Sequence, residues 1–151
     1  MTWAFDITLK NRIILKSFLE NFTLHQLNKI PKGFSNNIIW NIAHTIATQQ
    51  FLVYKLSGLP PIISEKMIES YRKGTKPERD LTQTEVDEIK GLLFSTIEKT
   101  KEDYNNDIFR NYNEYTVTTK NKLTNVEEAI AFNNFHEGVH LGYILALKKS
   151  L

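Results

Sequence analysis

The chain has 151 residues, no cysteine and a formal net charge of +2. A chain of this length can build one sizeable hydrophobic core, so we expect residues 1–151 to form a single domain. The lack of cysteine excludes disulfides, thiolate metal ligands and a cysteine nucleophile, which leaves His, Asp and Glu as metal ligands. The small, evenly spread charge argues against a nucleic-acid-binding surface.

Nothing in the sequence predicts export or membrane insertion. Charged residues that include Asp6, Lys10 and Arg12 interrupt the first apolar positions, so no signal-peptide core is expected. No apolar run approaches the roughly 18 residues that predict a transmembrane helix. A chain without disulfides fits a reducing compartment, and we expect a cytoplasmic protein with no membrane partner.

The first periodic segment predicts an amphipathic helix over residues 6–28. Ile7, Ile14 and Phe18 are among the apolar residues that recur at helical spacing, with Lys and Glu on the opposite face. A Pro-Lys-Gly sequence closes the segment.

A second helix is expected over residues 36–57, and a long connection follows it. Ser35 or Asn36 can cap its first turn, and Gly58 followed by two prolines is a strong stop signal. The connection, residues 59–81, contains the sequence MIESYR, which predicts one or two helical turns.

Two capping boxes mark the starts of the third and fourth helices. One is Thr82-x-x-Glu85 and the other is Thr124-x-x-Glu127, and the fourth helix is expected to continue to near the end of the chain. Between these helices, YTVTT at 115–119 has a β-type composition, but we expect no partner strand for it.

These segments predict an all-α fold, a four-helix bundle with long crossover connections. The two connections of about 20 residues are longer than an up-down-up-down bundle needs. At least one is therefore expected to cross over or to fold over an end of the bundle, where such loops often wall a site. We also expect exposed helix faces to pair two copies of the chain as a homodimer.

The sequence FHEGVH at 135–140 places His136 and His140 four residues apart, on one face of the fourth helix. It also matches the H-E-x-x-H motif of zinc proteases, in which the Glu is a general base and a third ligand follows. The residues after His140 include no His, Asp, Glu or Cys, so this interpretation lacks its third ligand. We expect Glu137, about 100° round the helix from His136, to point to a solvent-facing or helix-packing surface.

A third ligand can come from the second helix. Apolar neighbours that include Trp40 predict that His44 faces inward. His44 lies about 12 Å from the start of its helix and His140 about 14 Å from the end of the last helix, so the rings meet at one level if these helices are antiparallel. His25, among polar residues, is expected to lie away from the site. The alternative is that these are core histidines held by ordinary hydrogen bonds.

Two stretches resemble the DinB-like superfamily of four-helix bundles. NIIWNIAHTIATQQFLVYKLSGL at 37–59 resembles the second helix of that family. FHEGVHLGYI at 135–144 resembles its last-helix motif, a paired H-x-x-x-H followed by x-Gly and a polar or aromatic residue. Order, spacing and placement agree over most of the chain, although many members have Gln where this chain has Tyr143.

The resemblance implies a divalent metal, zinc or nickel, on His44, His136 and His140. Characterised relatives include transferases and isomerases that use a low-molecular-weight thiol such as bacillithiol or mycothiol. The first hypothesis is therefore a metal-dependent, thiol-dependent S-transferase that acts on a small molecule. The alternatives are a metal-dependent hydrolase and a non-catalytic metal-binding or stress-response bundle.

Overall fold

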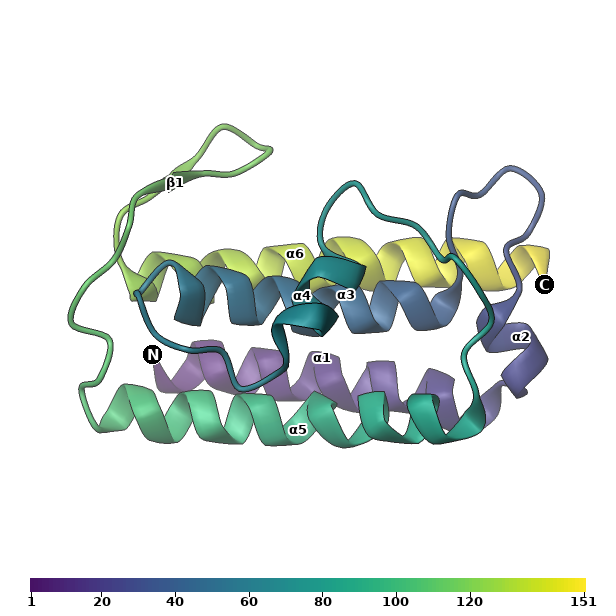
Figure 1. Cartoon of the computed structure of the whole chain (residues 1–151), viewed down its shortest axis with the longest axis horizontal. Coiled ribbons are helices and arrows are strands. Elements are labelled where there is room, and N and C mark those ends of the chain that lie inside the picture. The colour runs from purple at the N-terminus through teal and green to yellow at the C-terminus, as the bar shows by residue number, and fades with distance from the viewer.

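The computed structural model describes residues 1–151 and is an all-α helical bundle, as the sequence predicts (Figure 1). The long helices are α1 (Thr2–Asn21), α3 (Ile38–Gln50) with its π-helical continuation η1 (Phe51–Lys55), α5 (Gln83–Asn105) and α6 (Val126–Leu147). The short elements are α2 (Leu24–Asn28), α4 (Glu65–Tyr71), β1 (Tyr115–Thr116), β2 (Lys122–Leu123) and the 3-10 turn η2 (Lys148–Ser150). No helix combines the length and the apolar composition of a membrane span.

The long helices form a two-by-two bundle. Helix α1 packs beside α5 and α6, and α3 packs beside the same two helices. Figure 1 shows that α1 and α6 run in one direction and that α3 and α5 run in the other, so the α3–α6 pair is antiparallel. The connection from α3 to α5 travels along the bundle and lays α4 against α3, whereas the connection from α5 to α6 stays at one end.

The first predicted helix is divided in the structure. Helix α1 ends at Asn21, and α2 begins after Thr23. The Thr23 side chain accepts from the backbone N–H of Gln26, whose side chain accepts in return from the Thr23 backbone, which makes a capping box. The prediction of one continuous helix over 6–28 was therefore wrong, because this cap starts a new helix inside a continuing apolar pattern.

The predicted cap of α5 is confirmed, and that of α3 is displaced along the chain. Thr82 and Glu85 form the capping box at the start of α5. Helix α3 is capped by Asn37, whose side chain accepts from the backbone N–H of residue 40, rather than by Ser35 or Asn36.

The predicted cap of α6 is displaced by one residue. Asn125, not Thr124, is the N-cap, and its side chain accepts from the backbone N–H of Glu128 at 2.9 Å. The Glu128 carboxylate reaches back to the backbone N–H of Thr124 at 2.7 Å. Because that N–H belongs to the residue before the N-cap, the expected Thr124–Glu127 capping box is not formed, and Glu128 rather than Glu127 supplies the carboxylate.

The YTVTT segment does have a partner strand, so that prediction was wrong. Tyr115 pairs with Leu123 and Thr116 with Lys122 in an antiparallel hairpin. A strand of two residues is too short to leave a periodic pattern in the sequence. The MIESYR prediction is confirmed by α4, which ends at Tyr71.

Buried polar residues separate two clusters of apolar side chains along the bundle. One cluster includes Leu15 of α1 and Leu141 of α6, and the other includes Phe5 and Ile130 of the same helices. On each long helix, buried polar residues lie between the part in one cluster and the part in the other. They are Thr8, Arg12, Gln49, Gln50, Thr96, Asn133 and Glu137. Ile14, expected on the inner face of α1, is instead exposed.

Candidate metal centre

The structure brings His44 of α3 together with His136 and His140 of α6. One ring nitrogen from each lies within 4.8 Å of the others. The three pairs of ring centroids are 4.6 to 5.0 Å apart. The antiparallel arrangement of α3 and α6 thus places the rings at one level, as their positions along the helices predict. His25 is exposed on α2 and is not part of this group.

Two neighbours fix the ring of His44. Its Nδ1 lies 2.5 Å from the backbone oxygen of Tyr71, the last residue of α4. The indole of Trp40 stacks on the imidazole with centroids 4.7 Å apart and planes 10° apart. Because a carbonyl oxygen only accepts, Nδ1 carries the proton of the neutral ring, and Nε2 presents a lone pair to the site.

Asn41 fixes the ring of His140 in the same way. His140 Nδ1 lies 2.8 Å from Asn41 Oδ1. The Asn41 amide nitrogen donates to the side-chain oxygen of Asn36 and to the backbone oxygen of Asn37, which determines the orientation of the amide. His140 therefore donates from Nδ1 and also presents a lone pair at Nε2.

The Nε2 atoms of His136 and His44 are 3.2 Å apart. Two imidazole nitrogens on a tetrahedral zinc ion, each about 2.0–2.1 Å from it, are roughly 3.3 Å apart. The observed separation therefore suits two ligands of one ion. His136 Nδ1 is buried and has no hydrogen-bond partner.

Burial keeps these imidazoles neutral. Burial, with a smaller effect of the neighbouring histidines, lowers the pKa of His136 to about 3 and that of His140 to about 4. Burial also lowers the pKa of His44, although the hydrogen bond to the Tyr71 carbonyl opposes this shift. Neutral imidazole is the form that binds a metal ion, so the group is ready to act as a ligand set near pH 7.

Glu137 points into the bundle, not toward the three histidines. Its side chain has no exposed surface, and its Oε1 accepts from Arg12 Nε at 2.9 Å and Nη2 at 2.7 Å. The expected helix-packing position is observed, and a solvent-facing one is not. A carboxylate engaged by Arg12 in the core is not available as the general base of a zinc protease. Sequence reasoning missed Arg12, whose partner lies on a helix remote in the chain.

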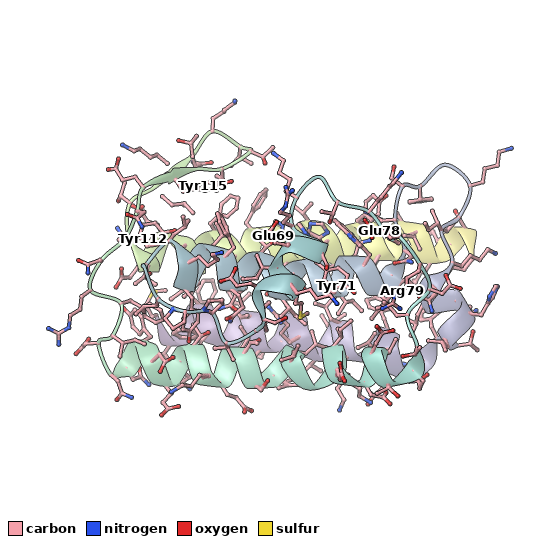
Figure 2. The ribbon with its side chains drawn as sticks, in the orientation of Figure 1. Glu69, Tyr71, Glu78, Arg79, Tyr112 and Tyr115 are labelled. Carbon is pink, nitrogen blue, oxygen red and sulfur yellow. The ribbon has the colours of Figure 1, made fainter.

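The surroundings of the site are partly open. Trp40 and Tyr71, which contact His44, also line a hollow of about 170 Å³, and most of the residues around it are polar or charged. Figure 2 shows Glu69 on α4, and Glu78 on the segment that follows it, near this hollow. None of the three histidines lines the hollow, but His136 and His140 keep partial exposure, so the group is not sealed from solvent.

A family model described as the DinB superfamily matches residues 9–144. The chain belongs to the DinB superfamily. The matched range includes His44, His136 and His140. No curated protein matches the chain. Both the membership in the DinB superfamily and the three-histidine group fit metal binding.

The metal-free protein should lose stability as the pH falls. Because burial depresses the pKa values of His136 and His140, the unfolded chain binds more protons than the folded chain below about pH 6.5. The loss should begin there and continue until the folded-state pKa values of about 3 and 4 are passed. From about pH 8 to about pH 5 we expect a loss of roughly 1–2 kcal/mol for each histidine in urea unfolding.

A double variant isolates this effect. Replacing His136 and His140 with Gln should flatten the dependence of the free energy of unfolding on pH. His25→Gln is the matched control, because the His25 side chain is exposed and outside the group. The same pH dependence in the parent and in the double variant would contradict the assignment.

Proposed function

We propose that the chain binds one divalent metal ion, zinc or nickel, through Nε2 of His44, His136 and His140. The 3.2 Å separation between the Nε2 atoms of His44 and His136 is the observation on which this proposal rests. The hydrogen bonds at Nδ1 of His44 and His140 support it, because they leave Nε2 of both rings free to bind. Nitrogen ligands suit zinc and nickel alike.

We propose further that the site serves a thiol-dependent S-transferase that acts on a small molecule. Three neutral imidazoles leave the charge of a dication intact and a coordination position free, the arrangement of catalytic sites. When bound, the ion would lower the pKa of a water or thiol ligand. The chain has no cysteine, so a low-molecular-weight thiol would be a cosubstrate from solution, and a reducing cytoplasm suits such a thiol.

Each of the three histidines should be required for metal binding. We expect His44→Ala to reduce the zinc content of protein purified without a His tag about as much as His136→Ala does, because both remove a ligand to the same ion. His25→Ala should keep the parent content. Elemental analysis measures the result, and full occupancy in the His44→Ala protein would show that the third ligand lies elsewhere.

A thiol should bind directly to the metal. In the cobalt-substituted protein, adding bacillithiol or cysteine should produce the near-ultraviolet charge-transfer band of a cobalt–thiolate bond, and the apoprotein should show none. Alanine in place of His140 should abolish the band, since it removes a ligand. A cobalt protein whose spectrum does not respond to thiols would contradict the transferase. It would favour the hydrolase or the non-catalytic bundle instead.

The outer face of α6 supports a homodimer. Between Ala129 and Leu147 the only charged side chain is Glu137, and it is buried. Phe135 and Val139 are 54% and 52% exposed on this face. Exposed apolar side chains that gather on one face of a helix often mark a contact with a partner.

Two glycines on the same face allow a second helix to approach closely. A Cβ at Gly138 or Gly142 would meet no atom of this chain within 4 Å, so packing within the chain does not require either glycine. Each costs about 1 kcal/mol relative to Ala inside a helix. Trp3 and Ile14 on the neighbouring helix α1 are further exposed apolar side chains.

The proposed dimer can be tested by changing one exposed side chain. Val139→Glu places a charge in the apolar face, so the mass measured by light scattering should fall from that of two chains to that of one. Glu88→Lys on the exposed side of α5 is the control and should remain dimeric. A parent protein that is monomeric at micromolar concentration would rule out this interface.

A further inference from the structure

Two of the three histidines have an acceptor at Nδ1, and the third does not. His44 donates to the Tyr71 carbonyl at 2.5 Å and His140 donates to Asn41 Oδ1 at 2.8 Å. His136 Nδ1 is buried without a partner. In metal sites, an acceptor at the second ring nitrogen fixes the tautomer and the orientation of the ligand. Of the three histidines, only His136 therefore still lacks an acceptor for its second ring nitrogen.

Asn133 carries a spare acceptor one turn before His136 on α6. Its Oδ1 is buried and unpartnered, while its Nδ2 donates to Glu137 Oε1 at 3.0 Å. Because a carboxylate oxygen only accepts, Nδ2 must face Glu137, and Oδ1 is left without a donor. Residues three apart are neighbours on a helix surface, so the spare acceptor and the spare ring nitrogen share one face.

An ion pair from another helix holds this amide. Arg12 of α1 donates twice to Glu137 Oε1, and neither charged side chain has any exposed surface. Rotating the Asn133 amide would place its oxygen against the carboxylate and lose the bond to Glu137. Leaving a buried polar group unpaired in this way costs about 1–3 kcal/mol. The orientation of Asn133 is therefore set before a metal binds.

The tautomer of His136 decides whether its Nδ1 can donate to Asn133. His44 Nε2 carries a lone pair, so in the metal-free protein the proton between the two Nε2 atoms belongs to His136. Nδ1 of His136 then also carries a lone pair, and it cannot donate to Asn133 Oδ1. With a metal at Nε2, the neutral ring must carry its proton on Nδ1, where Asn133 Oδ1 can accept it.

We propose that Asn133 is the positioning residue for His136 and accepts its Nδ1–H in the metal-bound protein. The Arg12–Glu137 pair keeps the amide in the orientation that this bond requires. The inference rests on the proposed three-histidine metal site. Glu137 Oε2 is also unpartnered, but its side chain leaves the helix about 100° from His136, so it is the poorer acceptor.

Nuclear magnetic resonance of the zinc-loaded protein tests this bond directly. The parent should show three protected Nδ1–H signals from its metal-bound histidines, and Asn133→Leu should lose the one from His136. Its affinity for zinc, measured against a chelating dye, should fall about 10- to 100-fold. Asn134→Leu is the matched control. It removes hydrogen bonds to α1 at the next residue and should keep all three signals and the parent affinity.

The double variant Asn133→Asp, Glu137→Gln supplies the rescue, because the new carboxylate keeps an acceptor for His136 and the new amide at position 137 can donate to it. It should retain the third signal, and it decides the question if Asn133→Leu does not fold. Persistence of the third signal in the Asn133→Leu protein, or its loss in the double variant, would overturn the proposal. Loss in Glu137→Gln with persistence in Asn133→Leu would assign the acceptor to Glu137. A parent that binds no zinc would instead overturn the metal site itself.

Discussion

The buried ion pair between Arg12 and Glu137 joins α1 to α6 in the middle of the bundle. Removing one partner of such a pair typically costs about 3–5 kcal/mol, because the other charge stays in the core. Glu137 follows His136 directly in α6. The rotation of α6 that brings Glu137 to Arg12 therefore also turns the face carrying His136 and His140 toward α3. The face on which the three histidines meet depends on this pair.

The long connection between α3 and α5 supplies the hydrogen-bond acceptor for His44. It carries α4 across α3 and places the last backbone oxygen of α4, at Tyr71, against His44. Carbonyls at a helix end have no partner inside their own helix, so His44 satisfies one of them and is itself fixed. Holding three largely desolvated imidazoles together costs free energy, and an ion that binds only the folded chain would offset that cost.

The histidine group could be predicted because the regular geometry of the helices fixes where its residues lie. The spacing of His136 and His140 and their heights relative to His44 follow from helix geometry, and the structure brings all three together. Arg12 could not be predicted as a core residue, because charged side chains are rarely buried completely and its partner is remote in the chain. The break at Thr23 was hidden by an apolar pattern that continues past it. Ile14 belongs to that pattern, yet it is exposed.

X-ray absorption at the edge of the bound metal tests the central claim most directly. The multiple-scattering pattern of imidazole reports how many histidine rings bind the ion. We expect three imidazole nitrogens at about 2.0–2.1 Å and at least one further light atom from solvent. The same measurement on the His25→Ala protein should be unchanged. A spectrum with fewer than three imidazoles, or with oxygen ligands only, would contradict a site built from His44, His136 and His140.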